Sequence, residues 1–236
     1  MYSKLTLNLD QFIRHQLEQF TALPLRKKKV HPVITISREF GCEGFPVAKI
    51  LSERLKKEGE LDWLIYNREL VDYVSDSKEF ENELMDSLNE QQRSQVDQFA
   101  DHLLAHKPNN YALYKQLARS VKALSERGHC IIVGSGGAIL TAELKNCIHI
   151  RLKASMDFRM DRISRELSVS RNEAKKIIEE NDRSRIDMIR NFTKQDVENP
   201  RFYDLIIDNE RFNSEQIADH IVLALNQRIP NWHNKS

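Results

Sequence analysis

This chain has few of the residues that mark several large protein classes. Its 236 residues include only three cysteines, an odd number with no CxxC spacing, which argues against a disulfide framework and against a zinc site. No apolar run approaches the ~20 residues that cross a bilayer, and the N-terminal stretch is too polar for a signal peptide. We therefore expect a cytoplasmic protein without membrane contact.

Net charge is also nearly absent. The chain has 36 Lys and Arg against 35 Asp and Glu, a formal net charge of +1. Such a balance leaves no overall electrostatic footprint for a nucleic acid polymer, although a local basic site remains open. The sequence does not indicate an oligomeric state.

What the chain does contain is five short apolar runs separated by helical patterns. Most runs are continuously apolar, which is typical of parallel strands covered on both faces. Strand and helix in alternation predict an α/β fold with a doubly wound, five-stranded parallel sheet. The predicted strands lie at residues 33–37, 63–66, 130–134, 147–152 and 203–208.

The rest of the chain divides around these strands. Residues 1–30 predict an N-terminal helix and a basic linker, and residues 31–230 predict the domain proper. Residues 68–127 are polar, poor in glycine and periodic at helical spacing, which predicts an inserted helical subdomain at one edge of the sheet. Capping-box patterns begin two later helices, Ser170 with Glu173 and Asn213 with Gln216.

The first strand leads into a loop with two glycines and then a helix, "ITISREFGCEGFPVAKILSERL" at residues 34–55. A strand–loop–helix unit of this kind presents backbone N–H groups and a helix N-terminus to an anion. Neither the lysine nor the hydroxyl residue of the P-loop pattern is present, and Gly44 and Pro46 stand in this part of the chain. Spacing alone leaves two interpretations, a phosphate loop or an ordinary tight turn. The phosphate-binding candidates are Gly41, Cys42, Glu43, Gly44 and Phe45.

The same stretch is similar to the opening of the cytidylate kinase-like family of P-loop kinases, which typically reads ISREYGSGGREIAKKLAEKL. Further segments match in order. "IYNREL" resembles YDREIL, "IIVGSGGAIL" resembles IIVGRGADYIL, "ASMDFRMDRI" resembles APLEFRVERI, and "FYDLIIDNERF" resembles LYDLVLNTSRL. "ENDRSR" resembles the family's lid, so the resemblance implies a mobile lid at residues 168–200 and an acceptor-binding role for residues 68–127.

Arginines are the candidate catalytic residues, because phosphoryl transfer depends on positioning and on positive charge around the moving group. They are Arg38, Arg159, Arg162, Arg183 and Arg185. The alternative for each is a salt bridge with a neighbour such as Asp182 or Asp187. Glu39 could hold magnesium through water or cap the following helix, and the sequence does not decide between these.

The resemblance implies an ATP- and Mg²⁺-dependent phosphotransferase acting on a small nucleotide, with CMP as the acceptor that the family suggests. It implies acceptor contacts at Asn67, Arg68, Ser135 and Gly136, and no metal-ligating residues are assigned. The chain departs from the family at Phe45, Pro46, Asn67 and Ser135. These departures favour the alternative, a catalytically impaired member that binds nucleotide and acts as a regulatory module.

Overall fold

The computed structural model describes residues 31–59, 62–67, 85–86, 88–103, 111–134, 136–230 and 232. The predicted N-terminal helix and linker at 1–30 lie outside these ranges, as do Arg68, Ser135 and much of the predicted insertion. Five parallel strands form one sheet in the order β2-β3-β1-β4-β5. They are β1 (Val33–Arg38), β2 (Leu64–Tyr66), β3 (Cys130–Val133), β4 (Cys147–Lys153) and β5 (Leu205–Asp208).

The five predicted strands and the doubly wound parallel architecture are therefore confirmed. β1 is the central strand, because Val33 stands beside Cys130 of β3 and beside Cys147 of β4. The helices are α2 (Gly44–Gly59), α5 (Glu90–Leu103), α6 (Tyr111–Arg127), α7 (Gly137–Leu140), α8 (Met156–Leu167), α9 (Arg171–Thr193) and α10 (Ser214–Arg228), with a short 3-10 helix at Pro200–Phe202.

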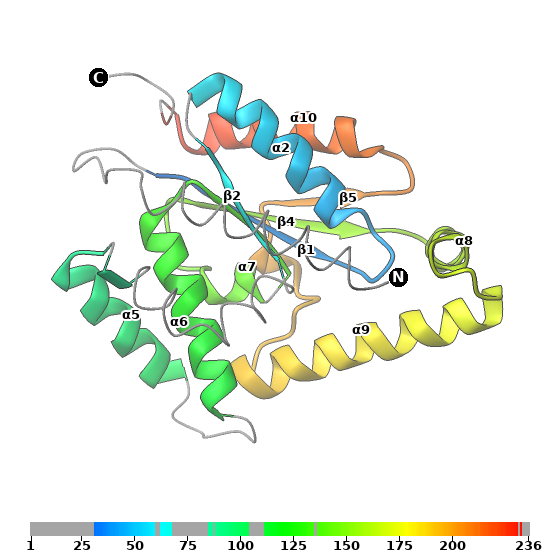
Figure 1. Cartoon of the computed structure of the whole chain (residues 1–236), viewed down its shortest axis with the longest axis horizontal. Helices are drawn as coiled ribbons and strands as arrows, with labels where there is room; N and C mark the ends of the chain where they lie inside the picture. The colour runs from blue at the N-terminus through cyan, green and yellow to red at the C-terminus, as the bar shows by residue number, and fades with distance from the viewer. Residues whose placement is uncertain are drawn as a thin grey trace, which may run out of the picture.

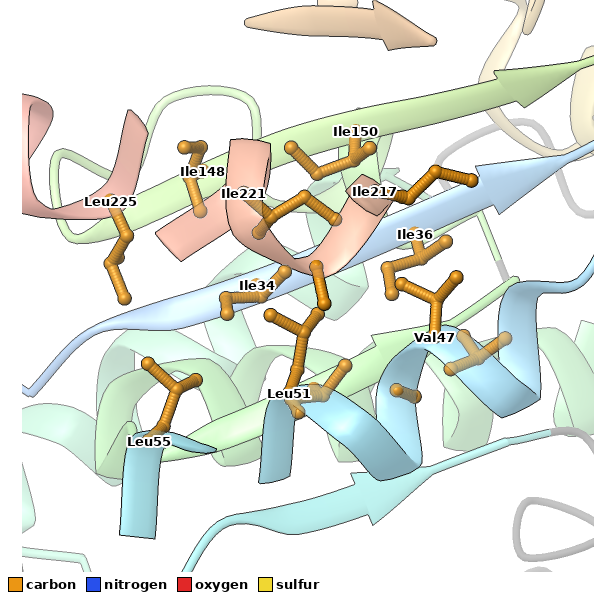
Figure 2. Close-up of a cluster of buried hydrophobic side chains, with 14 of the residues drawn as sticks. Ile34, Ile36, Val47, Leu51, Leu55, Ile148, Ile150, Ile217, Ile221 and Leu225 are labelled. Atoms are coloured by element: carbon orange, nitrogen blue, oxygen red, sulfur yellow. The ribbon is translucent and has the colours of Figure 1, made fainter. Parts of the chain in front are cut away.

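One face of the sheet is covered by α2 and α10 (Figure 1). Figure 2 shows the interior of this layer, where isoleucines of β1 and β4 meet the apolar side chains of the two helices. Successive strand residues point to opposite faces, so every second residue of β1 and β4 belongs to this cluster. Its labelled members are Ile34, Ile36, Val47, Leu51, Leu55, Ile148, Ile150, Ile217, Ile221 and Leu225, all at most 1% exposed.

The other face of the sheet carries α6, with α5 packed outside it (Figure 1). Leu117, Val121 and Leu124 of α6 share a buried cluster with Cys130 and Ile132 of β3. α5 and α6 lie within the predicted insertion at 68–127, and α6 covers this face of the sheet.

The two predicted capping boxes are both formed. The Ser170 hydroxyl accepts from the Glu173 N–H while the Glu173 carboxylate accepts from the Ser170 N–H, and Asn213 and Gln216 do the same for α10. The box at Ser170 starts a helix of 23 residues, which packs against α8 through Ile163, Ala174 and Ile178. This pair of helices projects from the carboxyl end of β4, beside the phosphate-loop candidate.

No helix among the residues that the structure describes is long and apolar enough to span a membrane. All three cysteines are buried and free.

Candidate functional site

The loop between β1 and α2 lies at the carboxyl edge of the sheet, outside its central strand. This is the position where open α/β sheets bind their ligands. Gly41 has a φ of +95°, in the region that favours glycine, and a Cβ there would lie 3.0 Å from Cβ of Arg159. The loop therefore needs glycine both for its turn and for its close approach to α8.

Several backbone N–H groups of this loop already donate to protein acceptors. Those of Cys42 and Gly44 donate within the loop, to the carbonyls of Glu39 and Cys42. The Phe40 N–H donates to Oδ1 of Asp182 at 2.8 Å. The Glu43 N–H donates to Oδ1 of Asn209 at 2.6 Å.

The Arg38 side chain runs across the start of α2 toward the end of β3. A Cβ on Gly44 would stand 2.6 Å from Cδ of Arg38, and a Cβ on Gly134 would stand 2.6 Å from its Nη1. Gly44 and Gly134 thus leave the space that the arginine fills. The sequence identified Arg38 as the nearest cation to the loop, but only the tertiary structure shows its direction.

Arg159 and Arg185 meet at one carboxylate. Nη1 of Arg159 lies 2.6 Å from Oδ2 of Asp182, and Nη1 of Arg185 lies 3.5 Å from Oδ1. Nη1 of Arg185 also donates to the Arg38 carbonyl at 2.9 Å, and Nη1 of Arg159 donates to the Phe40 carbonyl at 3.3 Å. The two arginines therefore join the phosphate-loop candidate to α8 and α9.

Arg162 lies on the same helix as Arg159 but forms its ion pair with a different carboxylate, that of Glu43 in the loop. Its Nη1 lies 2.6 Å from Oε1 of Glu43, and the Ser214 hydroxyl donates to Oε2 of Glu43 at 2.6 Å. The Glu43 carboxylate thus ties the loop to α8 and to the start of α10. Each of these contacts therefore lies within or beside the loop.

Glu39 is engaged at the junction of β4 and α8. Its Oε2 accepts from the Ala154 N–H at 3.1 Å, and the Lys153 and Arg159 nitrogens lie 3.7 Å from its carboxylate oxygens. These contacts of Glu39 are with β4 and α8, and they do not include the cap on the following helix that was one of the two predicted alternatives. Among the described residues no three His, Cys, Asp or Glu side chains group as metal ligands.

The other predicted catalytic and loop residues differ in whether they lie beside the loop. Arg183 is exposed on α9, while Arg159, Arg162 and Arg185 face the loop. Phe45 is the second residue of α2 and packs against the core cluster of that face, and burial raises the pKa of the Cys42 thiol to about 12, which keeps it neutral. These two loop residues are structural neighbours of the site.

On the acceptor side, Asn67 follows β2 and is half-buried, and Gly136 adopts a φ of +69° before α7. A Cβ on Gly136 would stand 2.5 Å from Cδ1 of Ile189 in α9. The glycine therefore lets α9 pack against the segment after β3. Arg68 and Ser135 lie outside the described residues.

Sequence reasoning missed Asn209 and Ser214, and it treated Asp182 only as a salt-bridge partner. A usable signal was present for Asn209, because it directly follows β5 and the carboxyl ends of parallel strands share one edge of the sheet. No comparable local signal marks Asp182, which lies in the middle of a long helix.

Residues 33–211 match the model of the cytidylate kinase-like family. A cytidylate kinase from Methanosarcina barkeri (strain Fusaro / DSM 804) is 31% identical over 91 residues, which cover 38% of this chain and 51% of that protein. The chain thus matches about half the length of this relative.

A solved structure is similar over a longer stretch. The crystal structure of an uncharacterized protein from Eubacterium ventriosum ATCC 27560 matches with a TM-score of 0.64 at 20% identity, over 84% of this chain and 99% of the other. At this identity the likeness shows a shared fold.

Proposed function

The chain belongs to the cytidylate kinase-like family, and we propose that it transfers the terminal phosphoryl group of ATP to a nucleoside monophosphate such as CMP, or to another small acceptor. The observation that carries the proposal is the placement of Arg38. Its side chain lies across the N-terminus of α2, between Gly44 and Gly134, at the carboxyl edge of the sheet. A cation in this place supports phosphate binding in a loop that lacks lysine.

Two features of the loop support phosphate binding. Gly41 provides the left-handed turn, and the first residues of α2 bring a helix N-terminus toward the same edge. Arg38 would hold the β- and γ-phosphates. Arg159, Arg162 and Arg185 would stabilise the negative charge that develops on the transferred group, while the acceptor oxygen bonds to phosphorus and ADP leaves.

Magnesium would neutralise part of the nucleotide's phosphate charge. The described residues offer no ready cluster of ligands for it, and Glu39 is already bonded to the Ala154 N–H. We therefore assign no residue to the ion and derive no step from it.

The acceptor would bind on the side of the site formed by the ends of β2 and β3. Asn67 and Gly136 follow these two strands, which are neighbours in the sheet. α9 approaches Gly136 through Ile189 and the phosphate loop through Asp182 and Arg185. A movement of α9 would therefore change both halves of the site, in line with the lid proposed for residues 168–200.

A second candidate function is a regulatory member of the family that binds nucleotide without turnover. It is favoured by the contacts that the loop already makes. The Asp182 and Asn209 side chains accept hydrogen bonds from two of its N–H groups, and Glu43 forms an ion pair with Arg162. These contacts must rearrange before phosphates can use the same groups.

One assay separates the two candidates. ADP release from Mg-ATP is measured with a panel of nucleoside monophosphates and small alcohols, for the parent protein, Arg38→Ala and the control Arg165→Ala. Arg165 is exposed on α8, and its Nε donates to the Asp161 carbonyl of its own helix. Acceptor-dependent ADP release that Arg38→Ala abolishes and Arg165→Ala retains supports the kinase. Calorimetric ATP binding without ADP release for any acceptor supports the regulatory member.

A further inference from the structure

Arg151 is a buried arginine within the sheet. It lies on the face of β4 opposite the isoleucine cluster, and its side chain is 5% exposed. The neighbouring residues on that face are also polar and buried, namely Thr35 and Ser37 of β1 and His149 of β4. Arginine is almost never this buried unless its charge is paired. The contacts of Arg151 therefore indicate its role.

These contacts compensate the charge only in part. Nη2 of Arg151 lies 3.4 Å from Oε1 of Glu198, whose side chain is 50% exposed. The guanidinium carbon lies 5.6 Å from the centroid of the Tyr203 ring, a cation–π contact. Nε has no hydrogen-bond partner among the residues that the structure describes. Because taking a charge out of water costs about as much as one such pair returns, stability alone does not account for this arginine.

Both partners of this arginine lie in one connecting segment. Residues 194–204, which we call the strap, join the end of α9 to β5 (Figure 1). The strap is bonded within itself. Nη2 of Arg201 donates to Oε1 of Gln195 at 2.7 Å, and the Tyr203 hydroxyl donates to the Val197 carbonyl at 2.5 Å. A contact that positions one part of the strap therefore positions the rest of it.

The strap connects α9 to β4. At its start, the Gln195 N–H donates to Oγ1 of Thr193, the last residue of α9, at 3.2 Å. At its end, the Asp204 N–H donates to the His149 carbonyl at 2.7 Å, and Oδ2 of Asp204 accepts from the His149 N–H at 2.8 Å. Arg151 contacts the strap between these two points. The position of the end of α9 thus depends on where Arg151 holds the strap.

A tilt of α9 at the strap would displace the residues that the helix carries toward the loop after β1. Arg185 stands a little over two turns before the end of α9 at Thr193, which places it about 12 Å from the strap at a rise of about 1.5 Å per residue. A tilt of about 5° moves a point at that distance by about 1 Å. The 2.9 Å hydrogen bond from Arg185 to the Arg38 carbonyl would lose its geometry in such a shift.

We propose that Arg151 is a positioning residue, which holds the strap in place and so sets where α9 lies over the loop after β1. It touches no reacting group. The inference rests on the proposed function for its kinetic readout alone, because the position of α9 is measured without any nucleotide.

The test measures the position of α9 directly. Nitroxide labels are attached through Ser184→Cys on α9 and Glu53→Cys on α2, which are exposed positions, whereas the native cysteines are buried. Distance distributions between the labels are recorded by double electron–electron resonance in the parent, in Arg151→Met and in the control Arg190→Met. Arg190 is exposed near the end of α9, so its variant makes the same substitution and the same charge change on the surface of the helix.

We expect the distance distribution to shift or broaden by about 1 Å in Arg151→Met, as for a tilt of about 5°, and to match the parent in Arg190→Met. The kcat for phosphoryl transfer should fall about 10²-fold in Arg151→Met, the loss associated with a misplacement of about 1 Å, while KM for ATP stays nearly unchanged. A purely structural arginine would lower only the unfolding free energy. An unchanged distance distribution, or a parent-like kcat in folded Arg151→Met, would overturn the proposal.

A second variant covers the case in which Arg151→Met does not fold. Glu198→Gln combined with Tyr203→Leu removes both partners of the arginine and leaves β4 unchanged. It should shift the distance in the same way, and an unchanged distance would contradict the proposal. A shifted distance together with no phosphoryl transfer to any acceptor by the parent protein would support the strap and refute the kinase.

Discussion

Gly44 offers a way to move Arg38 without deleting its charge. The first residue of α2 has an ordinary φ, so alanine causes no backbone strain there. Its new Cβ would stand 2.6 Å from Cδ and 3.1 Å from Nε of Arg38, and 3.2 Å from Cγ1 of Val133. Carbon atoms pack at about 3.5–4.0 Å, so the arginine must shift by about 1 Å.

The expected result is a loss of binding without a comparable loss of stability. Arg38 is flexible enough to yield, and alanine is favoured over glycine in helices by up to ~1 kcal/mol, so the unfolding free energy should change little. A charge-assisted hydrogen bond contributes about 1.5–3 kcal/mol, and its loss should raise the Kd for ATP roughly 10- to 100-fold. Isothermal titration calorimetry measures the Kd, and chemical denaturation measures the unfolding free energy.

A double-mutant cycle shows whether the effect passes through Arg38. Gly44→Ala should weaken ATP binding in the parent background and add almost nothing in the Arg38→Ala background. Gly137→Ala is the matched control, because its Cβ would meet Ile132 and Thr35 and not the arginine. Unchanged ATP affinity in Gly44→Ala, or an equal loss in both backgrounds, would refute the role given to Arg38.

Three further predictions concern α9 and the core. Arg185→Ala should lower phosphoryl transfer by about 10³-fold, as for an arginine finger, with ATP binding nearly intact; steady-state rates and calorimetry test this, and parent-like turnover would contradict it. Ser170→Ala should cost about 1 kcal/mol of unfolding free energy through loss of the N-cap, whereas Ser184→Ala, exposed on the same helix, should cost much less; equal denaturation midpoints would contradict it. Burial lowers the pKa of His129 to about 3, so the unfolded chain binds the extra proton and stability should fall as pH drops from about 6.5 toward 3; His129→Asn should flatten this dependence in denaturation series, and an equal slope would rule it out.

The sequence by itself determined the parts of this protein that depend on neighbours in the chain. Strand and helix positions follow from apolar periodicity, and the helix starts at Ser170 and Asn213 follow from side chains that bond within three residues. The position of the phosphate-loop candidate is likewise local, because strand, glycine loop and helix lie within residues 33–59. The sequence also identifies the arginines as candidates, but it does not specify their contacts.

Only the tertiary structure decided how these parts meet. The Phe40–Asp182 and Glu43–Asn209 hydrogen bonds join residues 142 and 166 positions apart, and they form because the strand order brings β1, β4 and β5 side by side. Local periodicity specifies which residues a strand buries, but the partners of a loop depend on which strand ends share an edge. The direction of Arg38 depends in the same way on the space left by Gly44 and by Gly134 of a separate strand end.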